Sequence, residues 1–130
     1  MTHKKQAFEQ IERTIKWNTT RGNITSTLNW DLEISMLQEE LDELQEAVSN
    51  NDKVGIFDAL MDLEFVLRGS CGKFGLNPEM QVDGYEAVLK ANESKSSTKN
   101  ALGKITKPKD FVGPEEQLQK ILDERRKNDI

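Results

Sequence analysis

Residues 39–43 read Glu-Glu-Leu-Asp-Glu, and residues 58–63 read Asp-Ala-Leu-Met-Asp-Leu. Both stretches lie in segments with helical periodicity, and carboxylates three or four residues apart on a helix share one face. Two such helices packed side by side would gather several carboxylates around one point. Carboxylates that close repel one another unless a divalent cation neutralises them, and hard oxygen ligands suit Mg²⁺ or Mn²⁺. The two stretches therefore predict a metal site between helices.

The rest of the chain has the pattern of an all-α protein. We expect helices over residues 4–19, 29–49, 53–74 and 78–92, and a short last helix from Pro114 through Leu122. Gly22, the turn at 50–52 and Gly75 mark the ends of the first three helices, as helix-ending residues do. Between Lys95 and Lys109 there are five lysines and no acidic residue. We expect this lysine-rich arm to connect the fourth helix to the last.

The composition favours one domain that is stabilised by association. The 130 residues suffice for a single domain with a modest core. We assign residues 1–93 to a helical core and residues 94–130 to an arm and short helix of the same domain. A hydrophobic content of 35% is low, and a charged content of 32% is high, for a free-standing monomer. We therefore expect a four-helix bundle completed by oligomerisation.

The charge and the cysteine count exclude several classes of protein. A net charge of −5 argues against general nucleic-acid binding, which favours a basic surface. Cys71 is the one cysteine, so no internal disulfide can form and a reducing compartment is expected. No apolar run has the length of a signal peptide or a membrane span. We expect a cytoplasmic protein, in a host cell if a phage encodes it, without a nucleic-acid or membrane partner.

A solvated helix face is the alternative explanation of the first acidic stretch. Against it, Glu40 and Glu43 border an apolar stripe rather than the opposite side of the helix. That stripe consists of Leu37, Leu41, Leu44 and Val48. In addition, no Lys or Arg follows these acids at the i+4 position, where a solvent-facing helix usually has one. Both observations favour the metal site.

The second acidic stretch lies in a helix that is apolar on most sides. Its main apolar face should consist of Ile56, Phe57, Leu60, Leu63 and Leu67. Asp58 and Asp62 project on the opposite side but are flanked by further apolar residues, so we expect them to be buried. Buried carboxylates without a basic neighbour cost several kcal/mol unless they are paired or bind a metal. We take Glu40, Glu43 and Asp62 as the main metal ligands, followed by Glu39 and Asp58.

These two stretches resemble the MazG-like all-α nucleoside triphosphate pyrophosphohydrolases. Their hallmark is a Glu-Glu-x-x-Glu helix followed by a helix with Glu-x-x-Asp, which together bind Mg²⁺. Residues 39–43 match the first part, whereas the second part has Ala59 in place of the glutamate. Asp58 instead resembles a variant branch that reads Asp-Ala-Leu-x-Asp-Leu. The number of metal ions therefore stays open.

The likeness extends along the chain on both sides of the acidic helices. Trp17, Asn18, Arg21 and Gly22 look like the segment that precedes the acidic helix in phage-type members. Residues 91–95 (Ala-Asn-Glu-Ser-Lys), Gly103-Lys104 and Phe111-x-x-Pro114 look like the tail of the phosphoribosyl-ATP-pyrophosphohydrolase-like branch. Each piece is weak alone, but their order is specific.

The resemblance implies that a (d)NTP and water give a (d)NMP and pyrophosphate, a reaction of nucleotide-pool control. Mg²⁺, or Mn²⁺ in its place, would bridge phosphate oxygens and lower the pKa of a bound water. Glu39 or Glu40 would act as the catalytic base that accepts that water's proton. The expected substrate-binding residues are Trp17, Asn18, Arg21, Asn92, Lys95 and Lys104. MazG-like chains associate as dimers or tetramers, so a second copy of the chain is an expected partner.

Two alternatives stay open, and the base is only weakly indicated. Ala59 is compatible with a non-catalytic helical oligomerisation module, and the same fold also serves phosphoribosyl-ATP hydrolysis. Spare carboxylates such as Asp31 and Glu33 would accept hydrogen bonds from a guanine. They tilt our expectation slightly towards dGTP.

Overall fold

The structure, a computed structural model, describes residues 2–95 and 98–128, without the side chains of residue 4 and residues 125–128. The described residues form five helices: α1 (His3–Thr20), α2 (Trp30–Ser49), α3 (Lys53–Lys73), α4 (Pro78–Glu93) and α5 (Glu115–Asn128). The prediction of an all-α protein is confirmed. The last helix is longer than predicted. None of the described helices is long and apolar enough to cross a membrane.

The chain divides into two compact units, Met1–Pro78 and Glu79–Ile130. The first unit contains α1, α2 and α3, and the second contains α4, the lysine-rich arm and α5. The boundary differs from the one at residue 93 that we predicted from the sequence; the assignment of residues 1–93 and 94–130 to one domain stays a prediction.

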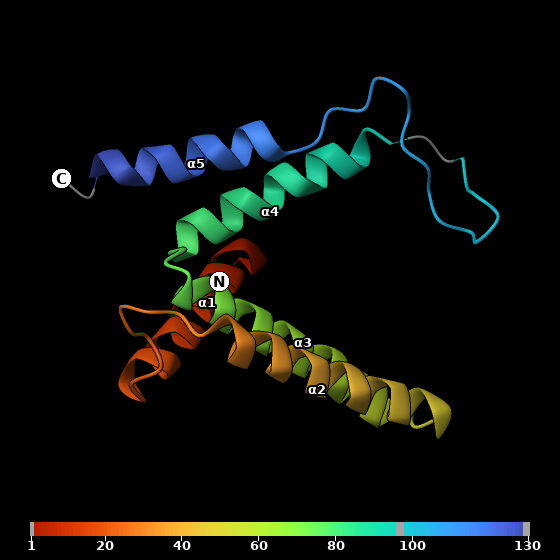
Figure 1. The fold of residues 1–130 in the computed structure, drawn as a ribbon, viewed down its shortest axis with the longest axis horizontal. Helices are drawn as coiled ribbons and strands as arrows, with labels where there is room; N and C mark the ends of the chain where they lie inside the picture. Colours follow the sequence, from red (N-terminus) through yellow and green to blue (C-terminus); the bar gives the residue numbers. More distant parts are fainter. Residues whose placement is uncertain (1, 96–97, 129–130) are drawn as a thin grey trace. The chain divides into compact units, whose positions relative to one another are not determined.

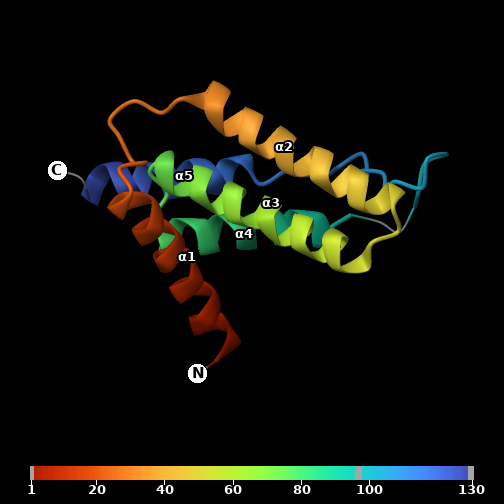
Figure 2. The ribbon, with the colours of Figure 1, turned by 90° about the horizontal axis from the view of Figure 1, so that it is seen from below.

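Local side chains start the helices of the first unit. The Asn29 side chain accepts a hydrogen bond from the Leu32 N–H at the start of α2. Asp52 does the same for the Gly55 N–H at the start of α3, at 3.0 Å. Such caps satisfy backbone donors that a helix leaves unpaired. Between them Asn51 has a φ of 51°, a left-handed conformation that asparagine tolerates. The tight turn folds α2 and α3 into an antiparallel hairpin (Figures 1 and 2).

The α2–α3 interface is lined by acidic and small residues. On α2, every seventh residue from Glu33 faces α3: Glu33 and Ala47 are buried and Glu40 is half-buried. On α3, Ala59 and Ser70 are buried in return. A Cβ built on Gly55 would lie 3.2 Å from the Ala47 Cβ. Small side chains therefore let the two helices approach closely, with the acids between them.

The predicted apolar face of α3 is only partly covered within the described residues: Ile56 and Leu63 are half-buried, and the other three residues are exposed. Phe57 is 67% exposed, and Leu60 and Leu67 are exposed as well. On α2, Leu41 and Val48 of the predicted stripe are likewise exposed, together with Ile34. We call Ile34, Leu41, Val48, Phe57, Leu60 and Leu67 the outer apolar face. Apolar side chains left in water gain nothing from the hydrophobic effect, so this face adds little to the stability of the single chain.

Helix α1 packs against the C-terminal half of α3 where α3 has glycines. A Cβ on Gly72 would lie 3.0 Å from the Ile15 side chain, and one on Gly69 would lie 3.2 Å from Asn18 Nδ2. Buried Ile11 completes this contact. Because both glycines lack a side chain, α1 can lie close to α3, which brings the end of α1 to the same helix that carries Asp62.

In the second unit, α4 and α5 pack against each other. A Cβ on Gly84 of α4 would lie 3.5 Å from Leu118 of α5. The arm between them runs beyond the C-terminal end of α4 and back (Figure 1). It contains an antiparallel β-bridge between Lys99 and Ile105, around a turn in which Gly103 has a φ of 81°. The arm is thus an ordered loop in the described residues rather than a helix.

Candidate metal centre and its surroundings

Glu40, Glu43 and Asp62 come together at the middle of the α2–α3 interface. Each offers one carboxylate oxygen, and these three oxygens lie within 4.8 Å of one another. Glu40 and Glu43 stand one helical turn apart on α2, and Asp62 faces them from α3. These are the three main ligands predicted from the sequence; Glu40 and Asp62 are half-buried, and Glu43 is exposed.

Glu40 has the environment of a metal ligand. Its Oε2 is buried and has no hydrogen-bond partner among the described residues. Buried polar atoms in native proteins are nearly always paired, so an oxygen of this kind fits a position that binds an ion or a water. Three carboxylates with a gap of this size suit a hard divalent cation such as Mg²⁺. The residues present therefore fit the predicted metal.

The same environment changes the acidity of Glu40. Burial, a hydrogen bond to Glu43 and the negative charges of Glu43, Asp62 and Glu39 raise the pKa of Glu40 from 4.5 to about 7. All of these causes disfavour the charged carboxylate. A cation bound at this point would reverse the effect of the neighbouring charges.

We expect the metal-free protein to become more stable as the pH falls from about 8 to 5. The unfolded chain has an ordinary Glu40 pKa of 4.5, and the folded state has one of about 7. Between these values the folded state binds the proton more tightly, so acidification favours folding. In EDTA, Glu40→Gln should be more stable than wild type at pH 8, should lose most of that advantage by pH 5, and should lose all of it only below the unfolded pKa of 4.5. Urea unfolding at both values measures this, and a difference that does not depend on pH would contradict it.

The other two predicted ligands do not join the cluster, and the expectation that Asp58 is buried is wrong. Glu39 and Asp58 are exposed and do not belong to the group of three close oxygens among the described residues. Ala59, which stands where the family hallmark has a glutamate, is 3% exposed and faces α2. A glutamate there would add a fourth inward carboxylate. This chain instead has a methyl group, so three acids form the inner set.

Trp17 and Arg21 form a half-exposed surface one turn from this cluster. The Trp17 ring lies edge-on to Phe65, with centroids 5.2 Å apart, and the Arg21 guanidinium lies 4.4 Å from the centre of the Trp17 ring. Phe65 follows Asp62 by three residues on α3, so it lies on the same side of that helix. The close packing of α1 on α3 thus brings an aromatic ring and a cation close to the acids. Phe65 is a member of this surface that the sequence pattern did not reveal.

Asn18 is buried, whereas Trp17 and Arg21 are exposed. It is 4% exposed; its Nδ2 donates to the Thr14 carbonyl and its Oδ1 accepts from Asn23, each at 3.1 Å. Its side chain therefore ties the end of α1 to the following loop. The predicted base contact would have to use the remaining Nδ2 hydrogen and Oδ1 lone pair of a side chain that is almost fully buried.

Glu33 is not a spare carboxylate, so that part of the prediction for guanine is wrong. Glu33 is 2% exposed, and Ser70 Oγ donates to its Oε1 at 2.9 Å. Lys73 Nζ donates to both of its oxygens, at 3.1 and 2.9 Å. Two residues that the sequence pattern does not connect with Glu33, 37 and 40 positions away, occupy three of its roughly four acceptor positions in a buried site. Asp31 is exposed at the first turn of α2.

The remaining predicted substrate residues belong to the second unit. Asn92 donates to the Val88 carbonyl at 2.9 Å, and Lys104 is exposed at the turn of the arm. The Lys95 ammonium lies 5.5 Å from the centre of the Phe111 ring. None of these contacts involves a carboxylate.

In a comparison with known protein families, residues 8–92 match the family described as phosphoribosyl-ATP pyrophosphohydrolase. This region covers α2 and α3 completely and nearly all of α1 and α4, and it contains every predicted metal ligand. A search of curated proteins gave no match.

Proposed function

The chain belongs to the phosphoribosyl-ATP pyrophosphohydrolase family, within the MazG-like all-α superfamily, and from that membership we propose a Mg²⁺-dependent enzyme that cleaves the α–β phosphoanhydride bond of a nucleotide. The observation that carries this proposal is the meeting of Glu40, Glu43 and Asp62 within 4.8 Å. A buried, unpartnered Oε2 of Glu40 among the described residues supports it further. An acidic interface that is not neutralised would otherwise push the two helices apart.

The residues divide into metal ligands and a base. Glu40, Glu43 and Asp62 would hold the cation, with Glu39 and Asp58 as outer carboxylates. When bound, Mg²⁺ would offset the charge of the phosphates and acidify a coordinated water. Glu39 is exposed beside the cluster, so it is free to accept a proton, and we favour it over Glu40 as the base. Glu40 is better suited to the cation because its buried oxygen faces the other two acids.

The nucleoside end would extend from the acids towards α1. The half-exposed Trp17 ring offers a stacking face, and Arg21 adds a cation beside it. We also retain Asn92, Lys95 and Lys104 as proposed contacts to the sugar and phosphates. Asn18 would support this surface from beneath through its bonds to Thr14 and Asn23.

Two substrates compete within this proposal. The sequence pattern favours a (d)NTP, hydrolysed to a (d)NMP and pyrophosphate. The matched family is described by phosphoribosyl-ATP, which favours that nucleotide as the second candidate. Since Glu33 is bound by Ser70 and Lys73, the structural argument for dGTP is reduced to the exposed Asp31.

Release of pyrophosphate from a nucleotide panel tests the function. The panel contains the four dNTPs, the four NTPs and phosphoribosyl-ATP, each with Mg²⁺, with Mn²⁺ and with EDTA. We expect hydrolysis that EDTA abolishes, and the highest kcat/KM identifies the substrate. If no nucleotide releases pyrophosphate with either metal, the proposal is wrong and the helical interaction module is favoured.

The outer apolar face gives the second part of the proposal, a homo-oligomer. Ile34, Leu41 and Val48 each follow an interface residue of α2 by one position, and Leu60 follows Ala59 on α3 in the same way. In an antiparallel pair this offset puts both rows on one side of the hairpin. Contiguous apolar surface of this kind marks an interaction site. A second copy would cover it and complete a four-helix bundle.

We expect light scattering to give a mass at least twice that of the chain. Leu41→Asp should shift the protein towards monomer, because it places a charge in the middle of the outer apolar face. Ser35→Asp, at an exposed position of α2 about a third of a turn around the helix from Leu41, is the matched control. A wild-type monomer at micromolar concentration would exclude the oligomer.

A further inference from the structure

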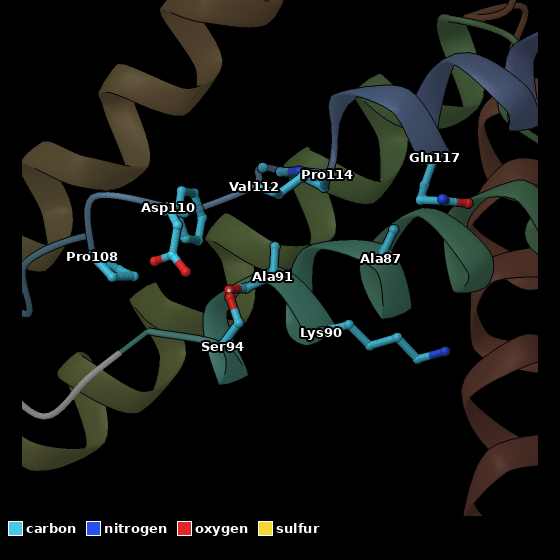
Figure 3. Close-up of a pocket in the computed structure, with 11 residues that line it drawn as sticks. Ala87, Lys90, Ala91, Ser94, Pro108, Asp110, Val112, Pro114 and Gln117 are labelled. Carbon is cyan, nitrogen blue, oxygen red and sulfur yellow. Dashed lines mark hydrogen bonds between the residues drawn. The ribbon is translucent and has the colours of Figure 1, made fainter.

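A cavity of about 350 Å³ lies wholly within the second unit. Ala87 and Ala91 of α4 point towards the arm, and Pro108, Val112 and Pro114 face them (Figure 3). The segment 108–117 that closes the cavity lies beyond the region that matches the family. Cavities of ~300–1,000 Å³ with a mostly apolar lining and a few polar groups are typical of small-molecule sites.

Phe111, which lines this cavity, holds two lysines. The ammonium groups of Lys95 and Lys107 lie 5.5 and 5.4 Å from the centre of its ring. Because Phe111 is half-buried against the cavity, its ring is a fixed support. Cation–π attraction restricts both side chains at this distance. Both ammonium groups therefore lie around one ring, each within 5.5 Å of its centre, so an extended phosphate chain rather than a single small group could reach both.

The local charges favour an anion. Between Lys95 and Lys109 the chain has five lysines and no acid. Among the described residues, neither Lys95 nor Lys107 has a carboxylate within 4.0 Å. Asp110 and Lys90 also line the cavity, but Lys90 points away from the arm (Figure 3), so Asp110 is one negative charge that a bound anion would have to avoid. Two like charges held by one ring repel each other, and a bridging phosphate removes that repulsion.

We propose that Lys95, Lys107 and Phe111 form a clamp for the phosphate chain of a nucleotide, with the cavity beside the ring receiving the attached group. Lys107 is a phosphate-binding residue, and Phe111 is a positioning residue that acts through both lysines. The identification of the ligand as a nucleotide rests on the proposed function. The clamp itself rests on the geometry of the second unit.

Calorimetry of the full chain in EDTA tests the clamp without catalysis. The probes are inorganic pyrophosphate, a dNTP, the matching monophosphate and the free nucleoside. We expect pyrophosphate and the triphosphate to bind more tightly than the monophosphate, and the nucleoside to bind weakest. Affinity should fall as salt is raised, because part of it is electrostatic. If pyrophosphate binds more tightly than the dNTP, the clamp binds the product; if the dNTP binds more tightly, it binds the substrate.

Matched variants show whether a loss of pyrophosphate binding comes from the lost lysine charge or from a damaged fold. Lys107→Met should bind pyrophosphate about tenfold more weakly, the loss of one charge-assisted contact, and Lys107→Arg should retain binding. Phe111→Leu should weaken binding in the same direction. Lys109→Met, which removes an exposed charge from the same segment, is the control and should bind like wild type.

Two results would overturn the clamp: equal affinity of Lys107→Met and wild type for pyrophosphate, or a nucleoside that binds as tightly as its triphosphate. Asp62→Asn should lose hydrolysis and keep metal-free pyrophosphate binding. Failure of the proposed function, in which wild type hydrolyses nothing, is therefore distinct from failure of the clamp, in which pyrophosphate binding does not depend on Lys107.

Discussion

Asp62→Asn should slow Mg²⁺-dependent pyrophosphate release on the order of 10³-fold, which corresponds to about 4 kcal/mol of transition-state stabilisation. Asparagine has nearly the same shape as aspartate but replaces an anionic oxygen by a neutral one. The remaining acids of the close group, Glu40 and Glu43, come from α2 alone, so α3 would contribute at most the exposed outer carboxylate of Asp58. A cation held from one side is both weaker and less well oriented.

The size of this effect can be checked against a matched acid on the same helix. Glu64→Gln also removes a carboxylate from α3, but Glu64 is exposed and paired with Arg68 at 2.7 Å. We expect its kcat/KM to stay close to that of wild type. Glu43→Gln should behave like Asp62→Asn, since both oxygens belong to the close group.

The stability of Asp62→Asn shows whether a loss of activity comes from the lost metal ligand or from a damaged fold. In EDTA, Asp62→Asn removes a charge that repels Glu40, so the variant should unfold at a denaturant concentration no lower than wild type. A variant that keeps more than a third of wild-type activity at saturating Mg²⁺ would show that the cation is held elsewhere. An inactive variant that is also unfolded would not count as support.

Local signals were sufficient to predict the helices from the sequence. Asn29 and Asp52 cap α2 and α3 through residues three positions ahead, and contacts of that range can be inferred from sequence spacing. The inward placement of Glu40, Glu43 and Asp62 was also accessible, because carboxylates without nearby lysines are costly to bury in any other way.

The faces of the helices were harder to predict, for a physical reason. The apolar pattern of α3 did not show which residues would face α2: Leu60 and Leu67 are exposed, whereas Ala59 and Ser70 are buried. An apolar pattern indicates a face suited to burial and does not say whether the same chain or a second copy covers it. Long-range pairs are hidden for a similar reason. Nothing in the spacing of Glu33 and Lys73, 40 residues apart, marks them as partners.

The buried ion pair between Glu33 and Lys73 is the basis of the second prediction with a large expected effect. Lys73→Met should destabilise the first unit by about 3–5 kcal/mol, the usual result of leaving one member of a buried ion pair unpaired. Glu33 is 2% exposed and would keep only the Ser70 hydroxyl as a donor among the described residues. Methionine preserves the length of the lysine side chain, so the loss reports on charge rather than on packing. Urea unfolding followed by the fluorescence of Trp17 and Trp30 measures it, because both tryptophans lie in the first unit.

Two further variants decide whether the charge of Glu33 is the cause. Lys16→Met, at an exposed position on α1, should change stability by less than about 0.5 kcal/mol, as surface substitutions usually do. The double variant Glu33→Met/Lys73→Met should recover most of the loss, since well-packed apolar residues often replace a buried ion pair at little cost. If the double variant is no more stable than Lys73→Met, the lysine acts through packing around Gly22–Asn29. Recovery would instead mean that Lys73 is retained because an acid occupies position 33, seven residues before Glu40 on the same side of α2.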